Sequence, residues 1–187
     1  MTELVCELIV TLDAYARGTR SPGFFGYSGP DFQNWVKANS SMPHRVLMGR
    51  KTYEALGALP AEAHDDDWDR MVSTPGFLFS TTLATADWPG LQVVKDDMVG
   101  FVSDLKRDDG PELRVLGSLS LVRQLLSAGL VDRLKLVICP LILPQTGTEP
   151  TFDGVPDIGF ELVSSEILDK RVLLVECRPA GAPPYSD

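Results

Sequence analysis

The segment His44–Glu54 (HRVLMGRKTYE) combines residue types that together bind anions. Its short apolar run Val46–Met48 meets Gly49, and the cations Arg50 and Lys51 follow at the expected start of a helix. The first turn of a helix presents free backbone N–H groups, and its dipole favours negative charge. The segment therefore predicts a site for a phosphorylated cofactor. The alternative is an ordinary strand–turn–helix whose two cations are solvated.

A second candidate follows the first apolar segment, Leu4–Leu12, where Asp13 stands two residues before Tyr15. A carboxylate at the end of a strand could hydrogen-bond a substrate or assist its protonation. An aspartate in this position could equally close a turn, because its side chain accepts hydrogen bonds from nearby backbone amides. Both roles stay open for Asp13.

Apolar runs alternate with segments of helical periodicity, which indicates the elements that position these residues. The expected strands are Leu4–Leu12, Val46–Met48, Phe77–Ser80, Leu91–Val94, Leu113–Leu116 and Leu134–Leu143, then an antiparallel pair, Phe160–Leu168 and Val172–Arg178. The expected helices are Pro30–Asn39, one opening at Thr52–Leu56, Met98–Arg107 and Leu119–Ala128. This order predicts a three-layer α/β/α domain with a mainly parallel sheet and a C-terminal antiparallel hairpin.

The domain is expected to span residues 1–178, and the Pro-, Gly- and Ala-rich segment 179–187 is expected to be a disordered tail. Ala61–Ser73, which contains three consecutive aspartates at Asp65–Asp67, is expected to be a solvated acidic loop. Adjacent aspartate side chains diverge in direction, so these three do not suggest a metal site.

Composition excludes several classes of function. The formal net charge of −9 over 187 residues argues against a nucleic-acid or membrane-surface partner, because both demand a basic face. No apolar run reaches membrane-spanning length and no signal sequence opens the chain, so a cytoplasmic location is expected. The three cysteines and two histidines lack metal-ligand spacing, so we expect buried reduced thiols and no metal site.

Three expected strands close on small residues, at Met48-Gly49, Ser80-Thr81 and Leu116-Gly117. The carboxyl ends of parallel strands lie at one edge of a sheet, where α/β proteins bind ligands. The first and third of these ends lead directly into helices, so two helix N-termini there could hold a pyrophosphate. The dinucleotide fingerprint G-x-G-x-x-G is absent, so the pattern does not indicate a Rossmann fold.

Four segments in this order resemble the dihydrofolate-reductase superfamily: Val10–Tyr15 (VTLDAY), Leu47–Glu54 (LMGRKTYE), Phe79–Leu83 (FSTTL) and Val115–Val122 (VLGSLSLV). The chain is more closely similar to the reductase domain at the C-terminus of the bifunctional deaminase/reductases of riboflavin biosynthesis. The segments that carry this closer resemblance are Leu125–Leu134 (LLSAGLVDRL) and Val137–Leu141 (VICPL). The resemblance covers residues Glu3 to Arg178.

The resemblance implies a dihydrofolate-reductase-like fold, a homodimer, and NADPH as the hydride donor. It implies that Gly49, Arg50, Lys51 and Thr52 lie on the side of the pyrophosphate and adenosine phosphate. Ser80 and Thr81 would lie near the 2′-phosphate and adenine, and Gly117, Ser118, Leu119 and Ser120 under the pyrophosphate and nicotinamide ribose. Asp13 and Tyr15 would lie beside the nicotinamide and substrate, as the candidate catalytic residues.

The chain departs from the family at three places. Thr81 stands where the family often has arginine, so a preference for NADPH is expected to rest on Arg50 and Lys51. Gly117-Ser118 replaces a glycine pair that carries a cis peptide bond in dihydrofolate reductases. The loop Leu143–Thr148 replaces a more glycine-rich stretch.

The expected function is therefore reduction of a small heterocycle, resembling the 5-amino-6-(5-phosphoribosylamino)uracil reductase of riboflavin biosynthesis. That reaction opens the ribose ring of a ribosylamino-pyrimidine by delivery of a hydride. A dihydrofolate-reductase-like pterin reductase is the enzymatic alternative. Dihydrofolate reductases usually carry an acidic residue on the first helix that faces the pterin, whereas Asp31 stands close to the start of the corresponding expected helix. The alternative from another class of function is a nucleotide-binding protein of the same fold that has no catalytic activity.

Overall fold

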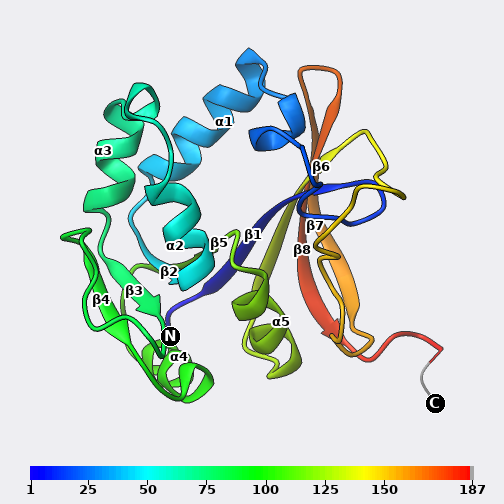
Figure 1. The fold of residues 1–187 in the computed structure, drawn as a ribbon. Coiled ribbons are helices and arrows are strands. Elements are labelled where there is room, and N and C mark those ends of the chain that lie inside the picture. The colour runs from blue at the N-terminus through cyan, green and yellow to red at the C-terminus, as the bar shows by residue number, and fades with distance from the viewer. Residues whose placement is uncertain (186–187) are drawn as a thin grey trace.

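An eight-stranded sheet organises the computed structural model, which describes residues 1–185 (Figure 1). The strand order is β4-β3-β2-β5-β1-β6-β8-β7, with parallel pairing from β4 through β6 and antiparallel pairing of β6 with β8 and of β8 with β7. The predicted α/β class and C-terminal antiparallel hairpin are confirmed. The strands are β1 Leu4–Thr11, β2 His44–Gly49, β3 Gly76–Phe79, β4 Leu91–Val94, β5 Glu112–Leu116, β6 Arg133–Cys139, β7 Gly159–Leu168 and β8 Val172–Gly181.

Helices cover both faces of this sheet, which gives the three layers (Figure 1). On one face, α4 (Met98–Arg107) and α5 (Leu119–Ser127) pack on alternate residues of β1 and β5. On the other face, α2 (Arg50–Gly57) and α3 (Asp66–Ser73) pack over β2 to β4, and α1 (Pro30–Ser41) packs over β6 and β8. Two short 3₁₀ helices span Gly23–Gly26 and Ala61–Ala63.

The structure corrects the acidic loop predicted at Ala61–Ser73, because most of that segment is α3. The Asp65 carboxylate caps this helix by accepting hydrogen bonds from the Asp67 and Trp68 amides at 3.1 and 3.0 Å. Asp66, Asp67 and Asp69 then occupy the first turn, where the helix dipole stabilises negative charge. The aspartates that suggested a solvated loop are therefore the start signal of a helix.

Several predicted boundaries also change. Helix α2 begins at Arg50 rather than Thr52, and β6 ends at Cys139, directly before Pro140, rather than at Leu143. A disordered tail from residue 179 is wrong for residues 179–181, which continue β8. Residues 186–187, the end of that predicted tail, lie outside the described residues.

The three cysteines lie in β1, β6 and β8 as free thiols. Burial raises the pKa of Cys6 to about 12 and that of Cys139 to about 11, which keeps both protonated near neutral pH. Cys177 is half-buried, and desolvation together with the neighbouring Glu176 also raises its pKa. None of them is activated as a nucleophile, since activation requires a lowered pKa.

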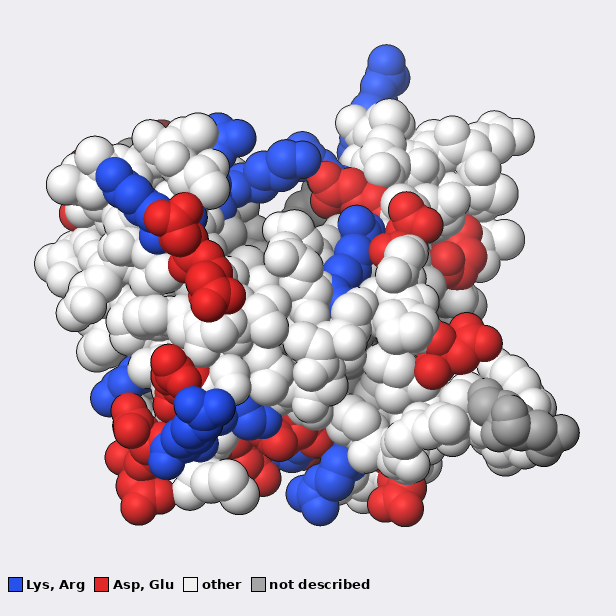
Figure 2. Space-filling view, turned by 90° about the horizontal axis from the view of Figure 1, so that it is seen from below, with Lys and Arg blue, Asp and Glu red and all other residues white. Residues whose placement is uncertain are grey.

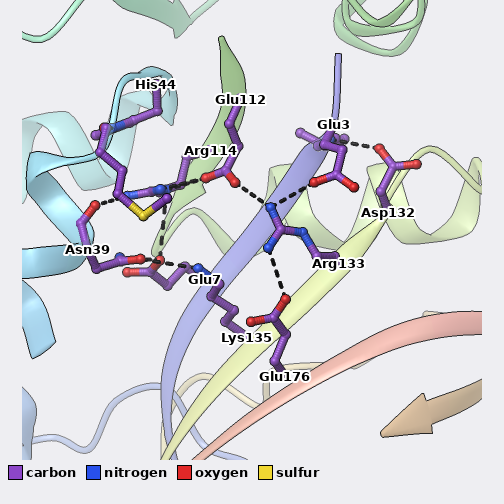
Figure 3. A network of polar contacts seen from close by, with 12 residues as sticks. Glu3, Glu7, Asn39, His44, Glu112, Arg114, Asp132, Arg133, Lys135 and Glu176 are labelled. Carbon is purple, nitrogen blue, oxygen red and sulfur yellow. Dashed lines mark hydrogen bonds and ion pairs between the residues drawn. The ribbon is translucent and has the colours of Figure 1, made fainter. Parts of the chain in front are cut away.

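A buried polar network ties the C-terminal end of α1 to the sheet (Figure 3). Asn39 donates a hydrogen bond to Glu7 of β1 at 2.7 Å and accepts one from Lys135 of β6 at 3.1 Å. Its backbone carbonyl accepts a further bond, of 2.7 Å, from the guanidinium of Arg114, which is only 1% exposed. Buried charges are tolerated only when they are paired and hydrogen-bonded, so α1 is held where these partners require it.

The same network continues along the amino ends of the strands (Figure 3). Glu112 of β5 lies between Arg114 and Arg133, with guanidinium–carboxylate distances of 2.5 Å to each. Arg133 also reaches Glu3 at 2.8 Å and Glu176 at 3.0 Å. These pairs connect β5, β1, β6 and β8 across the sheet.

The N-terminal end of α1 is capped from the far end of the sequence. The Asp169 carboxylate, in the turn between β7 and β8, accepts hydrogen bonds from the Asp31 and Phe32 amides at 2.9 and 3.0 Å. The Asp31 carboxylate accepts one in return from the Asp169 amide at 3.1 Å. A Cβ atom on Gly29 would lie 2.2 Å from the Asp169 carboxyl carbon, so a larger residue there would displace the capping carboxylate.

The surface carries charges of both signs. Figure 2 shows acidic and basic side chains interspersed on one face, with broad uncharged areas between them. Among residues 1–185 no helix has the length and apolarity needed to cross a lipid bilayer.

Replacing the tertiary cap should weaken the fold. We expect Asp169→Ala to lower the free energy of unfolding by about 1–2 kcal/mol, because two helix amides lose their acceptor. Lys170→Ala is the matched control, since Lys170 is exposed in the same turn and also has positive φ. Urea unfolding of both variants measures the difference. Equal midpoints for the two variants would show that the cap contributes nothing.

Candidate functional site

A cleft of about 620 Å³ opens at the carboxyl edge of the sheet, between the N-terminal ends of α2 and α5. All ten residues predicted to bind a cofactor line it, from the turns that follow β2, β3 and β5. The order β3-β2-β5 explains this convergence, because these strands are neighbours and run parallel. The cleft therefore collects the three strand ends that the sequence singled out.

A single hydroxyl joins two of these turns. Ser118, which is 3% exposed, accepts a hydrogen bond from the Gly49 amide at 2.8 Å and donates one to the Thr52 hydroxyl at 2.9 Å. Its side chain thus serves the start of α2 rather than capping its own helix. The N-termini of α2 and α5 are consequently fixed relative to each other.

The backbone of the β5–α5 turn has a conformation that suits glycine. Gly117 has a φ of +58°, in the left-handed region, and the peptide bond that follows it is trans. A Cβ on Gly117 would meet no atom closer than 4.0 Å, so the constraint on this position is conformational rather than steric. The absent side chain leaves the backbone open to the cleft.

Helices α2 and α5 both lack a side-chain cap on their N-terminal amides. Helix α4 differs, because the carboxylate of Asp97 accepts a hydrogen bond from the Gly100 amide at 3.0 Å. The two uncapped ends therefore offer backbone donors and positive dipole ends to the cleft, an arrangement that accommodates a pyrophosphate.

The turn after β3 contributes hydroxyl groups. Ser80 is buried, and its hydroxyl accepts hydrogen bonds from the Leu83 and Thr82 amides at 3.1 and 3.3 Å. Thr81 is exposed on the same turn and lines the cleft. Ser80 thus shapes the turn, while Thr81 presents an uncharged polar group.

Four cationic side chains line the cleft, and two of them already have partners within the protein. Arg50 pairs with Glu54 one helical turn later at 3.0 Å. Arg123 of α5 donates to the backbone carbonyls of Thr151, at 3.0 Å, and Pro150. Lys51 and Lys95 form no salt bridge within residues 1–185.

Acidic residues line the cleft as well: Asp96 and Asp97 after β4, and Glu149 and Asp153 in the loop after β6.

Asp13 does not line the cleft, and both of its carboxylate oxygens accept hydrogen bonds nearby. The donors are the Thr11 hydroxyl at 2.5 Å and the Leu143 amide at 2.7 Å. Desolvation acts to raise the pKa of Asp13, but the bonds from Thr11 and Leu143 outweigh it and lower that pKa. The geometry therefore matches the turn-closing role, and an ionised carboxylate is a poor proton donor near neutral pH.

Tyr15 also lies outside the cleft lining, in a ladder that the two loops after β1 and β6 form. Residues 14–19 pair with residues 146–151 through four backbone hydrogen bonds of 2.8 to 3.0 Å, which form two antiparallel bridges, Tyr15 with Pro150 and Gly18 with Gly147. A Cβ on Gly147 would lie 2.6 Å from the Tyr15 ring, so the ring packs flat against this glycine. Glu149 and Pro150 extend from this ladder into the cleft wall.

Sequence reasoning missed several lining residues, chiefly Lys95, Arg123 and Glu149. Lys95 follows β4, and the same strand-end argument that selected Ser80 would have found it. Arg123 lies one turn into α5, on the side that faces the cleft, which helical spacing alone does not reveal. Glu149 reaches the site through loop pairing that has no local sequence signal.

Comparison with known proteins places the fold. A family model described as "RibD C-terminal domain" matches residues 2–174. The "Uncharacterized protein YyaP" of Bacillus subtilis (strain 168) is 24% identical over 180 residues, which cover 92% of each chain. A "Putative riboflavin biosynthesis protein" from Shewanella sp. PV-4 has a TM-score of 0.75 at 20% identity, with 95% of this chain and 99% of that chain covered. A "pyrimidine reductase-like protein" from Corynebacterium diphtheriae has a TM-score of 0.69 at 15% identity, with 95% and 92% covered.

Removing the hydroxyl that joins the two turns should loosen the site. We expect Ser118→Ala to lower the free energy of unfolding by about 1–3 kcal/mol, because the buried Gly49 amide is left without an acceptor. Hydrogen exchange at that amide should accelerate. Ser120→Ala is the control, since Ser120 is exposed on the same helix and should change stability by about 0.5 kcal/mol or less. If the two variants have the same free energy of unfolding in urea, the hydrogen bond from the Gly49 amide to the Ser118 hydroxyl does not stabilise the fold.

Proposed function

Because the chain belongs to the RibD C-terminal domain family, whose members are reductases of the riboflavin-pathway type, we propose that it is an NADPH-dependent reductase of a small heterocyclic substrate. We propose a ribosylamino-pyrimidine as this substrate, because the chain resembles the reductase of riboflavin biosynthesis. The observation that carries the proposal is the pair of uncapped helix N-termini, joined through Ser118 and opening into one cleft.

The residues of this cleft fit a dinucleotide with a charged centre. Backbone amides at the starts of α2 and α5 would hold the pyrophosphate, with Lys51 supplying positive charge beside them. Gly49 and Gly117 would let that group approach the backbone closely, because neither has a side chain in the way. Thr52, Leu119 and Ser120 complete the proposed pyrophosphate side, and Ser80 and Thr81 the adenosine side.

When bound, a reduced nicotinamide supplies the hydride. The chain must then hold the ring in a fixed place against the substrate, and remote contacts to the pyrophosphate provide that positioning. We propose that this ladder, which contains Tyr15 and directly follows Asp13, borders the substrate. Asp13 would keep this ladder in position through Leu143 and would not serve as the proton source.

The two alternatives differ in what they require. A pterin reductase would need a carboxylate on α1 that faces the substrate, but Asp31 is bonded to the Asp169 amide. A non-catalytic binding protein would need only the cleft. Turnover therefore distinguishes the proposed reductase from a non-catalytic binding protein. The substrate that is reduced distinguishes it from a pterin reductase.

Calorimetry and absorbance assays test the function. We expect NADPH to bind with a dissociation constant in the range of about 1 μM to 1 mM and to be consumed when a ribosylamino-pyrimidine is added. Lys51→Gln should weaken binding about tenfold through loss of one charge-assisted contact, whereas Lys37→Gln on the exposed side of α1 should leave it unchanged. Binding without consumption of NADPH by pyrimidine, pterin or carbonyl substrates would favour the non-catalytic alternative. No binding of either NADPH or NADH would refute the proposal.

We also propose that two copies associate through the open face of β7 and β8. Cross-strand pairing puts Ile167 opposite Leu173 and Leu162 opposite Cys177, on the side of the hairpin that faces away from α1. Ile167 is 67% and Leu162 64% exposed. The side chains on this face are uncharged: Phe160, Leu162, Ser165, Ile167, Leu173, Val175, Cys177 and Pro179. A two-fold interface brings a surface against itself, so an uncharged apolar face is self-complementary.

Light scattering on the purified protein tests this association. The wild-type chain should have the mass of two copies. The Ile167→Lys variant should have the mass of one copy, because its lysines would be buried as like charges on both sides of the two-fold axis. Ser164→Lys adds the same charge to the opposite face of β7 and should leave the pair intact. A monomeric wild type, or a dimer that survives Ile167→Lys, would exclude this interface.

A further inference from the structure

One side chain of α5 is hydrogen-bonded to the ladder that residues 14–19 and 146–151 form. Arg123 lines the cleft one turn after the start of α5. Its Nε donates a hydrogen bond to the backbone carbonyl of Thr151 at 3.0 Å, and its Nη2 donates one to the carbonyl of Pro150. Because the guanidinium is planar and rigid, two such bonds fix its orientation as well as its place. Helix α5 and the ladder are therefore held together at two adjacent points.

The same two residues are bonded on their other side to the segment after β1. The Thr151 amide donates to the Ala14 carbonyl at 2.8 Å. Pro150 forms an antiparallel bridge with Tyr15. Thr151 is only 1% exposed, so the hydrogen bonds of its backbone are shielded from water. A continuous series of hydrogen bonds thus leads from α5, through the loop after β6, to the residues that follow Asp13.

Neither helix stability nor charge pairing accounts for an arginine at this position. The helix dipole stabilises cations near a C-terminus, whereas Arg123 lies near the N-terminal end of α5. Within residues 1–185 it forms no salt bridge, although Glu149 and Asp153 line the same cleft. Its partners are two neutral carbonyls, and a charged donor makes the stronger kind of hydrogen bond to them. The position suits the connection to the ladder instead.

We propose that Arg123 is a positioning residue for hydride transfer: it fixes the ladder, which borders the substrate, relative to α5, which holds the cofactor. This inference rests on the proposed function and names the side chain that keeps the two halves of the site at a constant separation. Hydride transfer needs the reacting atoms about 3–3.5 Å apart, and a misplacement of about 1 Å can slow such a step about a hundredfold. Arg123 acts through the carbonyls of Pro150 and Thr151 and not on the reacting atoms.

Amide hydrogen exchange on the full chain without ligand tests the connection. Arg123→Gln should accelerate exchange at the Ala16 and Thr151 amides at least about tenfold, because the ladder loses its hydrogen bonds to α5. The Gly49 amide, on the cofactor side of the cleft, should keep its exchange rate. Arg107→Gln is the matched control, since Arg107 is an exposed arginine of α4 that does not line the cleft.

Calorimetry and single-turnover kinetics then separate positioning from binding. We expect Arg123→Gln to bind NADPH within about twofold of the wild type but to transfer hydride to a ribosylamino-pyrimidine about tenfold or more slowly. In the steady state, the primary isotope effect with NADPH deuterated at C4 should rise, because hydride transfer becomes more rate-limiting. Arg123→Lys keeps one charged donor and should recover part of the rate. Thermal unfolding of each variant verifies its fold.

The outcomes distinguish this inference from the proposed function. A wild type that does not bind or does not consume NADPH overturns the proposed function, whatever the exchange rates are. If the wild type turns over and Arg123→Gln transfers hydride at the same rate, Arg123 is not a positioning residue, even where exchange in the ladder accelerates. If Arg123→Gln loses NADPH affinity by as much as it loses rate, the guanidinium contacts the cofactor, and the inference is also wrong. Unchanged exchange at Ala16 and Thr151 would refute the connection itself.

Discussion

The hydrogen bonds of the Ser118 hydroxyl hold the cleft in its shape. This buried group accepts from the Gly49 amide and donates to Thr52, so two turns separated by 69 residues in sequence share one polar atom. Neither helix that begins at these turns has a side-chain cap. The backbone donors at both helix starts are thus left to a ligand, while the hydroxyl keeps their separation constant. A site for an extended anion needs both properties, because free donors without fixed spacing would have to be ordered on binding.

Much of this arrangement could be predicted from the sequence, because its causes are local. The apolar runs that end at Gly49, Ser80 and Gly117 identify strand ends, and a parallel sheet brings such ends to one edge. The acidic segment at Asp65 shows how a local signal can be misread. Its three aspartates looked like a solvated run, although an aspartate followed by more acids in the next positions is also how a helix begins.

Other features depend on register and on long-range pairing, which no local pattern encodes. Lys95 reaches the cleft only because β4 pairs with β3 in the register that sets Val94 beside Phe79. Asp13 and Tyr15 were chosen for their place at the end of β1, but the loop after β6 determines their surroundings: it supplies the Leu143 amide to one and Gly147 to the other. The sequence shows both loops without showing that they pair.

The cap that Asp169 places on α1 couples the start of the chain to its last hairpin. Its partner amides at residues 31 and 32 are 138 and 137 residues away in sequence. A ribosome adds about 5–20 residues per second, so α1 emerges seconds before its cap is made. During that interval α1 is stabilised by its intrinsic helix propensity and by packing on the neighbouring strands, but the amide donors of its first turn face water. Completion of α1 is therefore a late event in biosynthesis, and the wall of the molecule that it forms becomes fixed only when the β7–β8 turn arrives.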